Sequence, residues 1–242
     1  MPAHNSTTTT PPGPARNPRV RDWFGRLITF WTLIVLVSAI AIGVFADLGE
    51  DVTENSTAWF DNAVRAWMIG HQNPIAYQIA YVITVIGSPG MLLIALAAGV
   101  WFFRRRGRSM AGVVVAAPAV AALLSGSVKL LIGRTRPAGG VLLNTYSFPS
   151  GHATTSASVA VTLCYVMARE GMISWTAAII IGGTVPLAVG LTRLYLDVHW
   201  TTDVIGGWAA GLFVAALCAA LYEYLRRNAP PDVGGAGVTA LK

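Results

Sequence analysis

Long apolar runs, separated by short polar segments, make up most of the sequence. Each run approaches the roughly 20 residues with which a helix crosses the hydrocarbon core of a membrane. Six spans can be drawn, at about 27–46, 80–103, 110–132, 152–168, 174–193 and 201–225. Gly87-Ser88-Pro89-Gly90 interrupts the second span, so we expect a kink or a break there, with Ile75–Ile86 as a separate half-helix. The pattern predicts an all-α fold, an integral membrane bundle of six transmembrane helices.

Composition supports a membrane protein. The chain is 54% hydrophobic and 12% charged, whereas a soluble domain carries about 25% charged residues. Its net charge of +6 comes from short basic clusters between apolar runs, not from the continuous basic face that a nucleic-acid partner requires. Cys164 and Cys218 both fall inside apolar runs. We therefore expect small buried hydrophobes at these positions and neither a disulfide nor a metal site.

The same pattern divides the chain into three parts. Residues 1–26 are rich in Thr, Pro and Arg and are expected to form a disordered basic tail. Residues 27–226 form the six-helix domain, and residues 227–242 a flexible C-terminal tail. No small-residue cleavage site followed by a soluble domain appears after the first apolar run, so this run is expected to be retained as a span.

Basic residues predict the orientation of the bundle. They lie before the first span, between the second and third, between the fourth and fifth, and after the sixth: Arg16, Arg19, Arg21, Arg26, Arg104, Arg105, Arg106, Arg108, Arg169, Arg226 and Arg227. With six spans all of them fall on one side, which is predicted to be cytoplasmic together with both termini. The segments 47–79, 133–151 and 194–200 then lie on the extracytoplasmic side of the cell membrane.

The first of these outer segments predicts a further helix. Between Trp59 and Met68, apolar residues recur at steps of three and four, with Asp61, Asn62 and Arg65 between them. This spacing indicates an outer amphipathic helix that lies in the membrane interface. A helix packed as a cap on the bundle fits the same spacing.

The last outer segment contains a histidine–carboxylate pair. His199 and Asp203 are four residues apart, so on a helix they share one face and can hydrogen-bond. A carboxylate on one imidazole nitrogen fixes the tautomer and leaves the other nitrogen as a base or a nucleophile. The alternative is an interfacial histidine that its neighbour merely satisfies.

Two more polar groups border the apolar runs. Ser150-Gly151-His152 opens the fourth run, where a helix N-terminus attracts an anion, although an ordinary helix start has the same residues. Lys129 and Arg136 are seven residues apart, and Arg193 precedes the histidine pair. Each cation could be a snorkelling anchor. A single phosphate site explains all of these groups at once, and ionisable groups beside membrane spans suggest function.

In this order the residues resemble the three-part signature of the type 2 phosphatidic acid phosphatase superfamily of lipid phosphatases. The three parts are Lys129…Arg136-Pro137, Pro149-Ser150-Gly151-His152 and Arg193…His199…Asp203. The motif-bearing core covers about residues 80–225. The segments Tyr146–His152 and Tyr195–Trp200 resemble the bacterial membrane branch of this superfamily, which acts on phosphatidylglycerophosphate and polyprenyl diphosphates.

The resemblance implies a role for each matching residue. His199 would be the nucleophile that forms a phosphohistidine, Asp203 would orient it, and His152 would protonate the leaving oxygen. The residues implied to bind the phosphoryl oxygens are Lys129, Arg136, Ser150, Gly151 and Arg193. The family uses no metal or cofactor, and its partners are a lipid phosphate substrate and membrane lipids.

This sequence departs from the family pattern at two positions. Thr192 stands where serine is usual, which keeps a hydroxyl group. Asp197 stands where glycine is common and adds a carboxylate near Arg193 and His199. Of pairing with Arg193, weakening phosphate affinity or pointing to water, we expect the last for Asp197.

An outward-facing site favours one substrate class, a polyprenyl (undecaprenyl or decaprenyl) diphosphate carrier whose phosphates have already crossed the membrane. Phosphatidylglycerophosphate is the second candidate, and phosphatidic acid or diacylglycerol diphosphate also fits. A non-catalytic lipid-phosphate transporter or binder would need the cations but neither histidine. Soluble vanadium haloperoxidases share the superfamily's pocket chemistry, but the apolar spans argue against that class.

Overall fold

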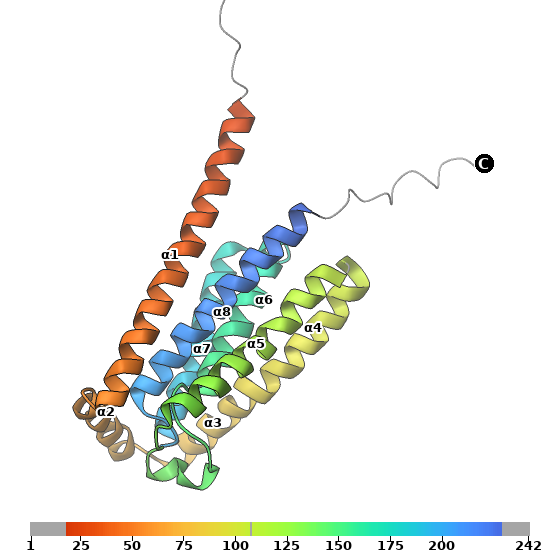
Figure 1. The fold of residues 1–242 in the computed structure, drawn as a ribbon. Coiled ribbons are helices and arrows are strands. Elements are labelled where there is room, and N and C mark those ends of the chain that lie inside the picture. Colours follow the sequence, from red (N-terminus) through yellow and green to blue (C-terminus); the bar gives the residue numbers. More distant parts are fainter. Residues whose placement is uncertain (1–17, 107, 229–242) are drawn as a thin grey trace, which may run out of the picture.

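The computed structural model describes residues 18–106 and 108–228, and over these residues it is helical without strands (Figure 1). The elements are α1 (Pro18–Glu54), α2 (Ala58–Gly70), α3 (Pro74–Val85), the π-helical turn η1 (Ile86–Gly90), α4 (Met91–Arg106), α5 (Arg108–Ile132), the 3-10 helix η2 (Ala138–Leu143), α6 (Gly151–Arg169), α7 (Trp175–Tyr195) and α8 (Thr201–Arg227). The predicted all-α class is confirmed.

Five stretches of the described chain are long and apolar enough to cross a membrane: Thr29–Glu54, Pro74–Arg105, Met110–Ile132, Trp175–Tyr195 and Thr201–Arg227. The sequence pattern predicted six. Helix α6 matches the remaining predicted span in position, but its His, Ser and Thr residues lower its hydropathy. Helix α6 packs against α5, α7 and α8. The hydroxyls of Thr154, Ser156 and Ser158 donate to backbone carbonyls, that of Ser158 to Ala117 O at 3.0 Å.

The kink or break predicted in the second span takes the form of a π-helical turn at the predicted residues. Residues Ile86–Gly90 join α3 to α4, and Pro74–Arg105 remains one apolar stretch. Pro89 has no N–H group and cannot extend the regular ladder of helical hydrogen bonds. One wider turn absorbs this defect without ending the helix.

The first helix is longer than the pattern predicted. Helix α1 begins at Pro18, a residue that suits the first turn of a helix, and it runs to Glu54. Residues 18–26, which were assigned to the basic tail, are therefore helical, since no breaker separates Pro18 from the apolar run. The tail residues 1–17 and 229–242 lie outside the described residues.

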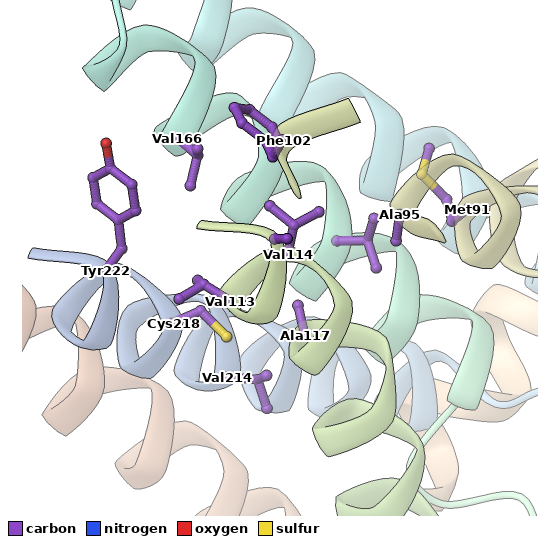
Figure 2. Close-up of a cluster of buried hydrophobic side chains, with 12 residues drawn as sticks. Met91, Ala95, Phe102, Val113, Val114, Ala117, Val166, Val214, Cys218 and Tyr222 are labelled. Carbon is purple, nitrogen blue, oxygen red and sulfur yellow. The ribbon is translucent and has the colours of Figure 1, made fainter. Parts of the chain in front are cut away.

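A cluster of buried side chains holds the bundle together (Figure 2). Helices α4, α5, α6 and α8 contribute Met91, Ala95, Phe102, Ala111, Val113, Val114, Ala117, Val159, Val166, Val214, Cys218 and Tyr222. Cys218 lies inside this cluster, and Cys164 is buried nearby on α6. Both thiols are free, which confirms that the cysteines serve as small buried hydrophobes.

Two glycines allow α8 to approach α6 closely. A Cβ atom at Gly207 would lie 2.8 Å from both Ser150 O and Ala153 Cβ, and one at Gly211 would lie 2.6 Å from Thr154 O. Small residues four apart are a common means of bringing membrane helices together. The close contact joins the first turns of the two helices, where Ser150 N donates a hydrogen bond to Asp203 O at 2.9 Å.

The three predicted outer segments lie at the same end of the bundle. Figure 1 shows α2, η2 and the connection between α7 and α8 together at this end, which we call the loop end. The C-terminal ends of α4 and α8 lie at the opposite end. The polar residues of segments far apart in the sequence are thereby collected in one place.

We expect Gly207→Ala to lower the free energy of unfolding by about 1–3 kcal/mol, because the added methyl group forces α8 away from the α6 backbone. The midpoint of thermal unfolding in detergent measures this loss. Gly183→Ala on α7 is the control, since no heavy atom lies within 4 Å of its Cβ position. The control should keep or raise the midpoint, because alanine favours helix. Equal midpoints for the two variants would contradict the packing argument.

Candidate active site

The hydrogen bond expected between His199 and Asp203 is present, although His199 precedes α8 and so does not share a helix face with Asp203. His199 Nδ1 lies 3.2 Å from Asp203 Oδ2, and both residues are buried. On the other side of the ring, Arg136 Nη1 lies 2.9 Å from His199 Nε2. A guanidinium group can only donate, so Nε2 accepts and the ring proton resides on Nδ1. His199 therefore directs the lone pair of Nε2 toward a cation.

Burial keeps His199 uncharged. Desolvation lowers the pKa of His199 to about 4, although the hydrogen bond and the charge of Asp203 both act to raise it. Burial disfavours the charged form of an imidazole, and here it outweighs the neighbouring carboxylate. The ring is therefore neutral at neutral pH, which is the form that can act as a nucleophile.

Three donors hold the Asp203 carboxylate. Besides His199, Trp200 N donates to Oδ2 at 2.9 Å, and Arg134 Nη1 donates to Oδ1 at 2.8 Å. Asp203 lies in the first turn of α8, where the helix dipole favours a negative charge. Its carboxylate therefore has a fixed position from which to orient the His199 ring.

Two cations line the segment between η2 and α6. Lys129, in the last turn of α5, donates from Nζ to Tyr146 O at 2.7 Å and to Ser147 O at 3.0 Å. Arg136 Nε donates to Thr145 O at 2.9 Å. Desolvation lowers the pKa of Arg136, and the charge of Asp203 partly restores it. Hydrogen bonds to backbone carbonyls thus hold these two cations in place at the loop end.

Arg193 lies inside the bundle and is not a snorkelling anchor. Its exposed fraction is 6%, and its Nη1 donates to Thr84 Oγ1 on α3 at 2.8 Å. Its buried Nε has no hydrogen-bond partner. A buried charged donor without a partner is costly, so this nitrogen is suited to an anionic ligand.

The start of α6 completes the cluster. His152, in the first turn, interacts electrostatically with Arg193, His199, Arg136 and Lys129. Ser150 is buried, and its Oγ has no hydrogen-bond partner. Gly151 begins the helix, so its N–H is among those without a partner inside the helix. The fold thus brings all eight predicted site residues to the loop end.

A cavity of about 680 Å³ opens beside two of the cations. Lys129, Arg136, Thr145 and Tyr146 line it together with Leu130 of α5. Leu130 is largely exposed on the bundle surface. A ligand with a phosphate at one end and a hydrocarbon chain at the other matches this combination of walls.

The sequence interpretation assigned no role to Arg134 and Asp61. Arg134 donates to Asp203 and, through Nη2, to Asp61 Oδ2 at 2.6 Å. Asp61 is only 1% exposed, whereas Trp59 and Trp67 on the same helix are 75% and 58% exposed. Asp61 therefore faces the bundle together with Val64 and Met68, as in the packed-cap alternative. Two features of the sequence could have indicated these residues. Arg134 is a second arginine two residues before Arg136, and Asp61 is a carboxylate among apolar neighbours.

The expectation that Asp197 points to water is wrong. Arg65 Nε and Nη2 donate to its carboxylate at 2.6 Å and 2.9 Å, and Gly139 N donates at 3.1 Å. Hydrogen bonding to Asp197 raises the pKa of Arg65. An arginine from α2, distant in sequence, captures the carboxylate. The Thr192 hydroxyl donates to Val189 O within α7.

The described residues contain no group of three or more His, Cys, Asp or Glu side chains arranged to hold a metal ion. The charges collected at the loop end are instead cations of the protein itself, with Asp203, Asp61 and Asp197 as their counterions.

Comparison with known proteins identifies the arrangement. Residues 110–227 match the model of the PAP2 superfamily. The chain contains a PAP2 superfamily domain. The resemblance inferred from the three-part signature is therefore confirmed.

Two curated proteins and one solved structure are similar to this chain. Phosphatidylglycerophosphatase B of Bacillus subtilis (strain 168) is 28% identical over 191 residues, which cover 76% of this chain and 93% of that protein. An undecaprenyl-diphosphatase of Sulfolobus acidocaldarius is 38% identical over 72 residues, 30% of this chain and 32% of that protein. The crystal structure of a transmembrane PAP2-type phosphatidylglycerolphosphate phosphatase from Bacillus subtilis matches with a TM-score of 0.69 and 25% identity, over 79% of this chain and 98% of that one.

We expect the His199 ring to stay neutral, with its proton on Nδ1, until the pH falls to about 4. Nitrogen-15 NMR of histidine-labelled protein in detergent reports both properties, and the chain has only four histidines. The signal that disappears in His199→Gln assigns the residue. Asp203→Asn removes a charge that raises the pKa, so its midpoint should be lower still. A midpoint near the ordinary value of about 6.5 would contradict the buried geometry.

Proposed function

We propose that the protein hydrolyses a phosphate monoester or diphosphate of a membrane lipid through a phosphohistidine at His199. One observation carries the proposal. The lone pair of His199 Nε2, on a ring oriented by Asp203, faces the guanidinium group of Arg136. Neither a structural anchor nor a simple anion site requires a neutral, oriented imidazole at its centre.

In the proposed first step, His199 Nε2 attacks phosphorus. An N–P bond forms, the P–O bond to the lipid breaks, and His152 gives a proton to the departing oxygen. Arg136 moves from Nε2 to a phosphoryl oxygen as phosphorus takes its place. Together with Lys129 and Arg193 it stabilises the charge on the three equatorial oxygens. Asp203 stabilises the positive charge that develops on the His199 ring.

In the second step, water attacks the phosphohistidine. His152, now without its proton, accepts one from the water as the new P–O bond forms. The N–P bond breaks, inorganic phosphate leaves, and His199 returns to its neutral form. We assign no metal or cofactor to either step, because the three cations supply the positive charge that phosphoryl transfer needs.

Two substrates have support. The relative named phosphatidylglycerophosphatase B matches over 93% of its own length, which favours phosphatidylglycerophosphate. The similarity to an undecaprenyl-diphosphatase covers only 32% of that protein, so the polyprenyl diphosphate favoured by the sequence becomes the second candidate. Both are anionic lipids with one long apolar part, as the walls of the cavity beside Lys129 require.

We further propose that α6 crosses the membrane as a sixth span, with α2 as the outer helix. Both termini are then cytoplasmic, and the loop end faces the extracytoplasmic side. The positions of the arginine clusters support this orientation. Phosphate would then be released on the outer side of the cell membrane.

Purified protein in detergent, with a chelator present, should release inorganic phosphate from phosphatidylglycerophosphate faster than from undecaprenyl diphosphate. His199→Ala should abolish release, because it removes the proposed phosphoryl acceptor. A phosphoenzyme stable to alkali and labile to acid should form in the wild type and not in His199→Ala. His71→Ala is the control, since this exposed histidine lies outside the site. Near-normal turnover by His199→Ala would refute the nucleophile, and binding without turnover by the wild type would indicate a lipid-phosphate binder.

Sidedness can be tested with single cysteines in a background where Cys164 and Cys218 are replaced by alanine. Leu143→Cys, at an exposed position of the loop end, should react with a membrane-impermeant thiol reagent in intact cells. Gly107→Cys, beside the arginines that follow the second span, should react only after the membrane is broken. The reverse pattern would overturn the proposed orientation.

A further inference from the structure

We propose that Asp61 on α2 is a positioning residue for the His199–Asp203 pair and that it acts through Arg134. This inference rests on the proposed function, because it assumes that the pair performs the chemistry. It adds a residue that lies outside the three-part signature and outside the matched residues 110–227.

Arg134 bridges two buried carboxylates. Its Nη2 lies 2.6 Å from Asp61 Oδ2, and its Nη1 lies 2.8 Å from Asp203 Oδ1. The exposed fractions of the two carboxylate side chains are 1% and 0%. A buried carboxylate is tolerated only where charge and hydrogen bonds replace water. The orientation of the guanidinium plane is therefore set from both sides.

Asp61 also fixes the backbone between the two residues of the pair. Its Oδ1 accepts from Thr202 N at 2.9 Å, and its Oδ2 accepts from Thr202 Oγ1 at 2.7 Å. Arg134 Nη1 donates to the same hydroxyl at 2.7 Å. Thr202 lies in the first turn of α8, between His199 and Asp203. Asp61 thus binds Arg134, which is the partner of Asp203, and it also binds Thr202 in the helical turn that contains Asp203.

The Trp200 ring reinforces the bridge. The Arg134 guanidinium lies 5.5 Å from the ring centroid, and Arg65 lies at 5.7 Å. Trp200 Nε1 donates to Thr135 O at 2.9 Å, which fixes the ring to the residue that follows Arg134. A cation above an aromatic face gains additional attraction and loses freedom to rotate.

The bridge divides the positive charge of Arg134 between two acceptors. If Asp61 lost its charge, the guanidinium would pair with Asp203 alone. Asp203 would then accept the Nδ1–H of His199 less strongly, and the preference for the Nδ1–H tautomer would weaken. The nucleophilic lone pair on Nε2 depends on this tautomer, so loss of Asp61 should slow the chemical step more than it weakens binding.

A second ion pair of α2 provides a matched control. Arg65 and Asp197 also join α2 to the region before α8, at the same distance of 2.6 Å. The hydrogen bonds of Asp197 go to Arg65 and Gly139, and none of these residues bonds to His199 or Asp203. If Asp61 only anchored α2, Asp61→Asn and Asp197→Asn would have similar effects.

Asp61→Asn should lower kcat by about 10- to 100-fold, as expected when a reacting group is misplaced, and should leave KM near the wild-type value. Asp197→Asn should leave kcat near the wild-type value. Arg134→Lys keeps the charge but cannot bridge both carboxylates with two nitrogens, so it should reproduce the loss. Combining Asp61→Asn with Arg134→Lys should add little further loss, since residues that act as a unit are not additive.

The NMR signal of His199 provides a readout that does not need turnover. Asp61→Asn and Arg134→Lys should reduce the Nδ1–H tautomer, and Asp197→Asn should not. If the wild-type protein hydrolyses neither lipid, the proposed function fails, and this spectrum still tests the bridge. Equal kcat losses for Asp61→Asn and Asp197→Asn, fully additive losses with Arg134→Lys, or an unchanged His199 spectrum would each overturn the positioning role.

Discussion

The Asp203 carboxylate, at the first turn of a membrane helix and without exposure to solvent, is the constraint around which the loop end is arranged. Removing such a charge from water costs several kcal/mol unless other groups replace the water. The replacements come from separate segments. Arg134 follows α5, while Trp200 N and the His199 ring precede α8. The hydrogen bonds that stabilise the buried charge of Asp203 therefore also determine the orientation of the His199 ring.

The cations at the loop end show the complementary problem. Lys129 and Arg136 are bonded to backbone carbonyls, which do not neutralise them, and Arg193 keeps a buried Nε without a partner. Positive charges gathered in this way repel one another, and a phosphoryl group with its several negative oxygens relieves that repulsion. The site is thus prepared for an anion before the anion arrives, which is the physical basis of electrostatic catalysis.

Helix packing brings these groups within reach of one another. The absence of side chains at Gly207 and Gly211 lets α8 approach α6, so that His152 and His199 meet at the loop end. Helix α2 covers this end with its carboxylate inward and its tryptophans outward. Val64 and Met68 of the same helix also pack against the bundle. The exposed tryptophans suit a position at the membrane interface, because indole rings are favoured there.

By itself the sequence determined the all-α membrane class, the positions of most spans and the eight candidate site residues, because apolar runs and short-range spacing along a helix are local properties. The hydrogen bond between His199 and Asp203 was expected from helical spacing, but the chain before α8 makes it, since His199 precedes the helix that carries Asp203. Tertiary structure alone decided the roles of Asp61 and Asp197. Each pairs with an arginine 73 or 132 residues away in the chain, Arg134 and Arg65 respectively. No periodicity reports which distant charges will meet, since the packing of whole helices decides which carboxylate loses its water and which cation replaces it.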